Sequence, residues 1–310
     1  MNNLEPENQT RLFKLNSHIL ELIRLDKKNN LPNKILLSGQ KGLGKSTLAY
    51  HFINYSLSKN ENFKYDINNF EINPENRSFK TILNKSNINF SLIDVNPEKK
   101  TIDINQIRDL ISNLKKSSLN EKPRYVLIDN IEFLNINSIN ALLKILEEPS
   151  ENVFFILINN NKHVLKTLLS RCINFKISIP HSQVLEITND LLNGDISEFI
   201  SKDLINYYST PGNLFNLVKF SKIYKYDLKD LHLSQFLRLI IKDKLYKKDS
   251  PINYLIYDFI EFYFNKVNLS LSSNINDKYS YFLRMMSDIK KFNLDEELFF
   301  IEFERKILNG

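Results

Sequence analysis

Short apolar runs alternate with longer amphipathic stretches through the first 180 residues. A short apolar run bounded by turns is typical of a buried strand, and apolar positions that recur every three or four residues are typical of a helix. The predicted strands are 34–38, 90–94, 125–128, 153–158 and 172–177. The predicted helices are 18–25, 46–58, 104–114, 138–148 and 162–169, with loops and short helices over 59–89. This alternation predicts an α/β fold built on a doubly wound parallel sheet.

The helix predicted over 138–148 has the most regular pattern, with its apolar residues on one stripe. Asn137 or Ser138 is expected to cap its first turn. Pro149 is expected to end it, because the residue before a proline avoids helical dihedral angles. Glu147 and Glu148 precede this proline, where the helix dipole disfavours anions. Nothing in the sequence explains why two carboxylates stand there.

Beyond Pro180 the pattern is helical, and we find no further convincing strand. We expect about three helices in 181–222, the last punctuated by Pro211-Gly212, and then helices at 231–245, 253–265, 279–292 and 296–306. The predicted domains are 1–180, 181–225 and 226–310. The 14 tyrosines and 22 phenylalanines are expected to pack helical cores rather than to stack on a ligand.

Residues 39–46 read G-Q-K-G-L-G-K-S and fit the phosphate-loop pattern G-x-x-x-x-G-K-[ST]. A predicted strand precedes them and a predicted helix follows, as the pattern requires. Three of the six glycines in the chain, Gly39, Gly42 and Gly44, lie in this stretch. Glycine suits a backbone that takes unusual dihedral angles or closely approaches a ligand. The alternative is a chance match, or a relic that no longer binds nucleotide.

The chemistry of such a loop predicts a role for each polar residue that follows. Backbone N–H groups and the helix N-terminus face the phosphates, and Lys45 places its ammonium on the β- and γ-phosphates. Ser46 offers its hydroxyl to Mg²⁺, and Thr47 packs behind it. We therefore expect ATP or ADP with Mg²⁺ as the ligand, and we expect Lys45 to face solvent when the loop is empty.

A nucleotide site also needs an acid at the end of a neighbouring strand to hold Mg²⁺. Asp129 directly follows the strand at 125–128 and has that position; an ordinary turn aspartate is the alternative. Ser46 and Asp129 are thus the predicted Mg²⁺-binding residues. Asn159 and Asn160, which follow the strand at 153–158, complete the predicted nucleotide-binding residues.

Hydrolysis requires a group that accepts a proton from the attacking water. In many ATPases of this broad class a glutamate follows the strand-end aspartate, but here the residue is Asn130. An amide orients a water and cannot accept its proton. Glu132 points the same way if the strand continues, but about 6–7 Å further along, and a displacement of that size predicts the loss of in-line chemistry.

Composition narrows the class of protein further. The formal charge is +6 and the isoelectric point is about 9.0, which fits either a solvated lysine-rich surface or proximity to nucleic acid. The lone Cys172 excludes an intramolecular disulfide and a multi-cysteine zinc site. The start of the chain does not read as a signal peptide, and no apolar run is long enough to span a membrane. We therefore expect a cytoplasmic protein without zinc.

Three further segments carry a family resemblance: D-I-N-Q-I-R at 103–108, N-A-L-L-K-I-L-E-E-P at 140–149 and S-R-C at 170–172. With the phosphate loop, and in this order, they resemble the bacterial DNA polymerase III clamp-loader family of AAA+ proteins. The resemblance implies a helical lid at 181–225 and a helical, oligomerising collar at 226–310. It also implies that Arg171 acts in trans, as an arginine finger on the γ-phosphate held by the next subunit. An ordinary surface arginine is the alternative.

Departures from the family pattern suggest which member the chain resembles. Motor subunits carry a glutamate at the position of Asn130, and a lid arginine at the position of Gly212. Many also carry a four-cysteine zinc module, whereas 59–89 contains no cysteine. The resemblance is therefore strongest to delta-prime subunits, which help load the sliding clamp on primed DNA together with motor gamma/tau-like and delta-like subunits, with little or no ATP hydrolysis of their own.

Two alternatives remain open from the residues. One is an active ATPase motor subunit of the same loader. The other is a different AAA+ DNA-transaction protein, which should carry a DNA-reading module that we do not recognise in 226–310.

Overall fold

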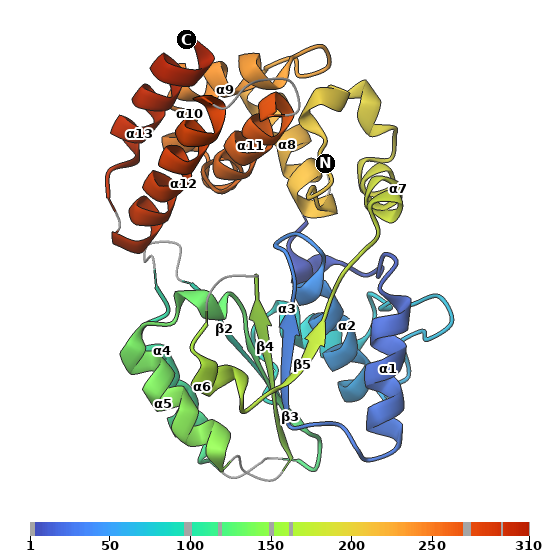
Figure 1. Cartoon of the computed structure of the whole chain (residues 1–310). Coiled ribbons are helices and arrows are strands. Elements are labelled where there is room, and N and C mark those ends of the chain that lie inside the picture. Colours follow the sequence, from blue (N-terminus) through green and yellow to red (C-terminus); the bar gives the residue numbers. More distant parts are fainter. Residues whose placement is uncertain are drawn as a thin grey trace. The chain divides into compact units, whose positions relative to one another are not determined.

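The computed structural model describes residues 4–95, 101–116, 120–148, 152–160, 164–268, 274–292 and 294–309. Side chains are described within these ranges, except at 250, 268, 274–277 and 290–292. The chain divides into two compact units, Met1–Pro180 and His181–Gly310 (Figure 1). The boundary predicted at residue 225 falls inside the second unit and stays a prediction.

The first unit is built on a parallel sheet of five strands in the order β2-β3-β4-β1-β5. The strands are β1 Lys34–Ser38, β2 Phe90–Ile93, β3 Arg124–Ile128, β4 Val153–Asn159 and β5 Ile173–Lys176. Each predicted strand is thus confirmed to within a residue or so. The order places β4 between β3 and β1, so the carboxyl ends of these three strands are neighbours at one edge of the sheet.

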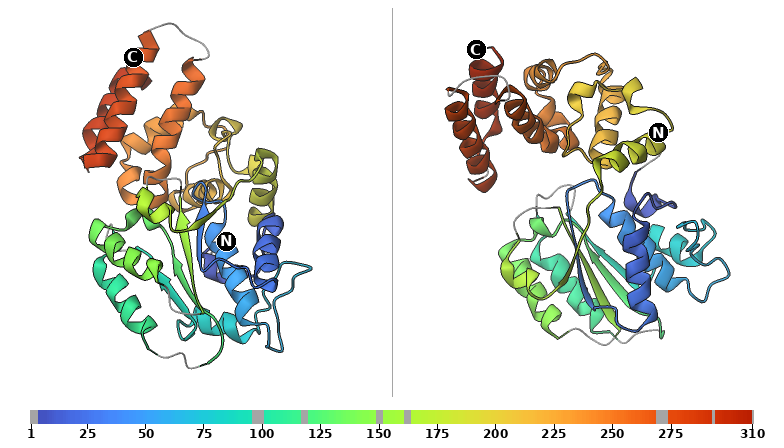
Figure 2. Two further views of the ribbon diagram at one scale, coloured as in Figure 1. Left: turned by 60° about the horizontal axis from the view of Figure 1, so that its bottom comes forward. Right: turned by 45° about the vertical axis from the view of Figure 1, so that its right-hand side comes forward.

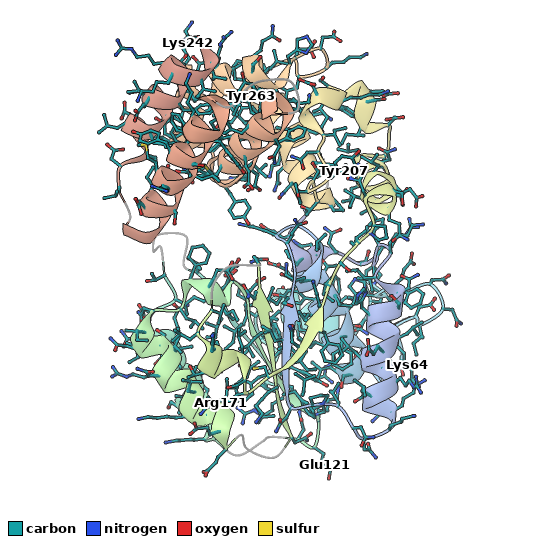
Figure 3. All side chains as sticks on the ribbon, viewed as in Figure 1. Lys64, Glu121, Arg171, Tyr207, Lys242 and Tyr263 are labelled. Atoms are coloured by element: carbon teal, nitrogen blue, oxygen red, sulfur yellow. The ribbon has the colours of Figure 1, made fainter. Side chains whose placement is uncertain are left out.

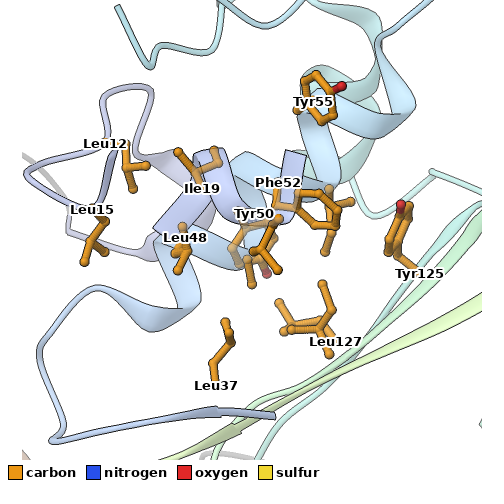
Figure 4. Close-up of a cluster of buried hydrophobic side chains, with 14 of the residues drawn as sticks. Leu12, Leu15, Ile19, Leu37, Leu48, Tyr50, Phe52, Tyr55, Tyr125 and Leu127 are labelled. Carbon is orange, nitrogen blue, oxygen red and sulfur yellow. The ribbon is translucent and has the colours of Figure 1, made fainter. Parts of the chain in front are cut away.

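Helices cover both faces of this sheet, as the two further views also show (Figure 2). The helical elements are η1 Pro6–Asn8, α1 Asn16–Lys27, α2 Lys45–Leu57, α3 Arg77–Leu83, α4 Ile104–Leu114, η2 Ile131–Phe133, α5 Ile136–Glu147 and α6 Lys166–Leu169. Alternate residues of a strand point to opposite faces. In β3, Tyr125 and Leu127 pack with α1 and α2 (Figure 4), whereas Val126 and Ile128 pack with α4 and α5.

The helices predicted in the first unit start within four residues of their predicted positions, and two of the differences have a clear description. Asn135, rather than Asn137 or Ser138, caps α5, because its backbone is extended and its side chain accepts a hydrogen bond from the Ser138 N–H at 2.8 Å. The helix α6 begins at Lys166, later than predicted. Residues 162 and 163, where that helix was expected to start, and Pro149 lie outside the described residues.

The segment before α1 is tied to α2 by a buried histidine. His51 has no exposed surface, its Nε2 lies 3.1 Å from the Gln9 carbonyl oxygen, and its Nδ1 lies 3.0 Å from the Tyr65 hydroxyl. Because a carbonyl oxygen only accepts, Nε2 carries the hydrogen and Nδ1 accepts from Tyr65. Burial lowers the pKa of His51 to about 4, so the imidazole is neutral and this linkage is structural.

In the second unit, every named element among the described residues is helical, and loops connect these helices. Its elements are α7 His181–Leu192, η3 Ile196–Glu198, η4 Lys202–Leu204, α8 Pro211–Tyr224, α9 Leu233–Lys242, α10 Leu245–Lys248, α11 Ser250–Asn268, α12 Asn274–Phe292, α13 Glu296–Phe303 and the π-helical turn η5 Glu304–Leu308. Among the described residues, no helix is both long and apolar enough to cross a membrane.

Two details of this unit correct the sequence interpretation. Pro211 is the first residue of α8, with Thr210 capping it, so Pro211-Gly212 starts this helix rather than interrupting it. The helix predicted over 231–245 is broken by Lys244, which takes a left-handed conformation (φ 50°). In that conformation Lys244 bonds the Glu297 carboxylate at 2.5 Å, a tertiary contact that the local pattern cannot reveal.

Aromatic side chains fill the core of the second unit, as predicted. Phe264, Phe282, Phe299 and Phe303 are at most 2% exposed and pack edge-to-face or tilted at centroid distances of 5.5–5.9 Å for most pairs. Such geometry is preferred by aromatic pairs and adds to the gain from burial.

Candidate nucleotide-binding site

The phosphate loop, residues 39–46, runs from the end of β1 to the first turn of α2. At Gly39 a Cβ atom would lie only 2.4 Å from the Ile177 carbonyl oxygen, so no larger residue fits. Gly44 precedes α2 with φ +81°, a left-handed conformation that other residues rarely adopt, and Gly42 has φ +86°. The glycines are therefore required by the shape of the loop itself.

Lys45 is buried in the loop, and the expectation that it faces solvent is wrong. It is 3% exposed, and its Nζ donates to the carbonyl oxygens of Gly39 at 2.9 Å and Gln40 at 2.6 Å. Burial lowers the pKa of Lys45 to about 8, although the nearby carboxylates of Asp129 and Glu132 favour its charged form. The loop thus folds around its own cation.

Asp129 follows β3 and lies against the phosphate loop. Its Oδ2 accepts a hydrogen bond from the Ser46 hydroxyl at 2.5 Å, and its Oδ1 accepts from the Asn130 N–H at 2.7 Å. Burial raises the pKa of Asp129 to about 6, and the bond from Ser46 partly offsets this. The structure therefore brings the two predicted Mg²⁺-binding residues together, with Thr47 half-buried in the next position of α2.

Among the described residues, no group of three or more His, Cys, Asp or Glu side chains is placed to hold a metal ion. A Mg²⁺ ion at Ser46 and Asp129 would therefore take most of its ligands from phosphate and water, as Mg²⁺ commonly does beside nucleotides.

A chain of side-chain hydrogen bonds runs along the carboxyl edge of the sheet beside these residues. Asn130 donates from Nδ2 to Asp94 at 2.8 Å and accepts at Oδ1 from Asn160 Nδ2 at 2.9 Å. Asn160 Nδ2 also lies 3.1 Å from Oε1 of Glu132. Asn159 contributes its backbone, since its carbonyl oxygen accepts from the Gly39 N–H at 3.3 Å. Both predicted asparagines are thus in the site region.

The placement of Glu132 corrects the sequence interpretation. The strand β3 ends at Ile128, Asn130 takes a left-handed conformation (φ 55°), and the turn η2 carries Glu132 back toward the end of β4. Its carboxylate therefore meets Asn160 and stabilises the charge of Lys45. The assumption that Glu132 lies further along an extended strand was wrong, and with it the argument that its distance excludes chemistry.

Sequence reasoning missed Asp94 as a member of this site, and it considered Glu132 but placed it too far away. Asp94 had a usable signal, because it is the last residue of the strand predicted at 90–94 and the carboxyl ends of parallel strands share one edge. The true position of Glu132 had no such signal, since it depends on the left-handed conformation of Asn130.

Arg171 lies between α6 and β5, at the end of the sheet where the strands begin and opposite the end that carries the phosphate loop. Its guanidinium bonds the Glu147 carboxylate, and Lys34, the first residue of β1, bonds the carbonyl oxygen of the adjacent Leu146 at 3.1 Å. The phosphate loop begins after the last residue of β1, and five strand residues span about 13 Å. Figure 3 shows Arg171 at the same end of the sheet as Glu121, which precedes β3. Arg171 is therefore separated from its own loop.

Glu147 thereby gains the explanation that the sequence lacked, because the cation of Arg171 compensates the unfavourable end of the helix dipole. Glu148, at the C-cap of α5, is exposed and remains unexplained. Gly212 is the second residue of α8 in the other unit.

Comparison with known proteins places this chain in a family. The family model described as "DNA polymerase III, delta subunit" matches residues 15–181, more than half of the chain. The chain is 27% identical over 263 residues to the DNA polymerase III subunit delta′ of Buchnera aphidicola subsp. Schizaphis graminum, covering 79% of this chain and 76% of that protein. It is 30% identical over 145 residues to the subunit gamma of Buchnera aphidicola subsp. Acyrthosiphon pisum, covering 46% of this chain and 38% of that protein.

Among solved structures, a DNA polymerase III gamma subunit-related protein from Thermotoga maritima is similar at 18% identity, with a TM-score of 0.47 over 90% of this chain and 96% of that chain. The chain spans about two fifths of the gamma relative but about three quarters of the delta′ relative. On the match over residues 15–181, the chain belongs to the DNA polymerase III delta subunit family of clamp-loader proteins.

Proposed function

We propose that this chain is the delta-prime-type subunit of a bacterial replicative clamp loader. In this role it assembles with motor subunits of the gamma/tau type and with a delta-type subunit, and helps to load the sliding clamp on primed DNA. The observation that carries the proposal is the position of Arg171 at the sheet edge opposite its own phosphate loop, combined with the family match. A cation placed there is suited to a neighbouring subunit.

Arg171 is proposed to act in trans as an arginine finger. A guanidinium is permanently charged and planar, so it stabilises the charge that spreads over γ-phosphoryl oxygens during transfer. Its side chain is 32% exposed, which leaves part of it accessible to a partner.

The phosphate loop is proposed to bind ATP or ADP with Mg²⁺. Lys45 would exchange its bonds to loop carbonyls for bonds to phosphate, which would also favour its charged form. The Ser46 hydroxyl, now donating to Asp129, would turn its oxygen toward Mg²⁺, and Asp129 would hold the ion through water.

Little hydrolysis is expected at this loop. The amide of Asn130 is engaged on both sides, by Asp94 and Asn160, and it cannot accept a proton. Gly212 supplies no lid cation. Asn130→Glu is not expected to restore hydrolysis, because Gly212 still leaves the lid without its cation. The new carboxylate also could not donate to Asp94, as Asn130 does, and would face the charge of that residue.

One observation favours the alternative of an active ATPase, namely that the Glu132 carboxylate lies beside Asn160 and near Lys45. Glu132 would then accept the proton that Asn130 cannot. Single-turnover hydrolysis of ATP by the isolated chain decides between the two: motor-like rates that fall with Glu132→Gln support the ATPase and contradict the proposal.

The test of the trans role is steady-state, DNA-stimulated ATP hydrolysis by the complex reconstituted with motor subunits. Arg171→Ala should slow it, by less than the roughly 10³–10⁵-fold attributed to such fingers, because only one of several sites is affected. Nucleotide binding by the isolated chain should not change. Arg77→Ala, at an exposed arginine of α3, is the matched control. Unchanged turnover of an assembled Arg171→Ala complex would refute the assignment.

A further inference from the structure

The guanidinium of Arg171 is held at two points within its own subunit. One Nη donates to the Thr167 carbonyl oxygen at 2.8 Å, and the other donates to the carboxylate of Glu147. An arginine side chain has five N–H groups in a rigid planar fork. Two contacts on different sides fix the plane of this fork and leave further N–H groups available to a ligand outside the subunit.

Glu147 itself stands on a fixed support. It is the last residue of α5, and the preceding Leu146 is fully buried. The Leu146 carbonyl oxygen accepts a hydrogen bond from Lys34 Nζ at 3.1 Å, which joins this end of α5 to the start of β1. The carboxylate is therefore held by the end of a helix that is hydrogen-bonded to the sheet, and not by a loop.

We propose that Glu147 is a positioning residue that orients Arg171 for the neighbouring subunit's nucleotide. The proposal rests on the proposed function, in which Arg171 acts in trans. Glu147 and Arg171 are 53% and 32% exposed, and ion pairs at such exposure contribute little to folding stability. A flexible arginine, in contrast, must lose several rotamers before it engages a phosphate, and a prior ion pair fixes them in advance.

The primary test is DNA-stimulated ATP hydrolysis by the reconstituted complex carrying Glu147→Gln, a variant of nearly the same shape without the charge. We expect turnover to fall about three- to tenfold, well below the roughly 10²-fold that a 1 Å misplacement can cost, because one site among several is affected. Glu147→Asp should recover part of the loss. Glu148→Gln, at the exposed neighbouring carboxylate, should turn over as the wild type does, and the melting temperature of each variant should be unchanged.

A double-mutant cycle separates positioning from a structural role. In an Arg171→Ala background, Glu147→Gln should have no further effect, since there is no guanidinium left to orient. An equal loss in both backgrounds would overturn the proposal, as would unchanged turnover in Glu147→Gln. A rise in turnover would also overturn it, because the contact would then restrain Arg171 and not prepare it. If Arg171→Ala alone has no effect, the proposed function fails first and this inference fails with it.

Discussion

The burial of Lys45 has a measurable cost, and replacing this residue by methionine tests it. A pKa lowered from 10.5 to about 8 corresponds to about 3 kcal/mol by which the folded state disfavours the charged form at pH 7. Lys45→Met keeps most of the volume and removes the charge, but it also leaves the Gly39 and Gln40 carbonyl oxygens without their donor, at about 1–3 kcal/mol each. The stability of Lys45→Met at a single pH therefore combines opposing contributions. The difference in pH dependence between this variant and the wild type reports only the titration of the Lys45 ammonium.

The folded protein binds this proton more weakly than the unfolded chain does. Between the folded pKa of about 8 and the unfolded value of 10.5, the unfolded state thus holds more protons, and stability rises with pH. From pH 7 to 9.5, the free energy of unfolding of the wild type should rise by about 2 kcal/mol relative to Lys45→Met.

The assay is urea unfolding at intervals of pH for the wild type, Lys45→Met and Lys27→Met, in which an exposed lysine of α1 is replaced. The Lys27→Met profile should run parallel to that of the wild type. Parallel profiles for wild type and Lys45→Met would refute the reasoning, because Lys45 would then not be charged at a cost. Fluorescent-nucleotide titration of Lys45→Met should also show weakened ATP and ADP binding. If the variant binds nucleotide as tightly as the wild type does, the phosphate-loop assignment is wrong.

Three further outcomes are expected. Because the pKa of Asp129 is raised to about 6, the folded state binds its proton more tightly than the unfolded chain, and the free energy of unfolding should fall by about 2 kcal/mol from pH 4 to 7. Asp129→Asn should abolish this fall in urea unfolding. The same variant should also lose Mg²⁺-dependent nucleotide binding. His51→Phe, which removes two buried hydrogen bonds, should lower the free energy of unfolding by about 2–3 kcal/mol at pH 7, measured by the same method. A fragment of residues 1–180 should be soluble and fail to assemble on size-exclusion chromatography, whereas 1–225 should aggregate, because Phe220 is 1% exposed and packs on residues beyond the cut.

The strands and the phosphate loop were predictable because their determinants are local. The apolar composition of residues 34–38 is by itself enough to predict a buried strand. Parallel topology then places the carboxyl ends of all the strands at one edge of the sheet. Asp129 followed from that rule alone. The same rule applied to β2 would have added Asp94 to the site.

What could not be predicted depends on single residues or on distant partners. The left-handed conformation of Asn130 turns Glu132 toward Asn160, and no periodicity marks it. The pairing of Glu147 with Arg171 joins residues 24 apart, so the sequence showed only an unexplained carboxylate. Lys45 is buried because the loop supplies its own carbonyl oxygens, which a motif defined by side chains does not describe.

The strand order has a consequence for how the chain is made. β1 emerges early in synthesis, but both of its neighbours come much later, with Lys34 paired to Phe155 and Ile35 to Ile173. Gly39 packs closely against the backbone of Ile177, so the phosphate loop also lacks one of its packing partners until Ile177 has been synthesised. At 5–20 residues per second, β1 waits on the order of 10 s without a partner. We therefore expect a nascent chain that ends before β4 to expose the apolar β1 to chaperones, and the phosphate loop to be among the last parts of the first unit to form.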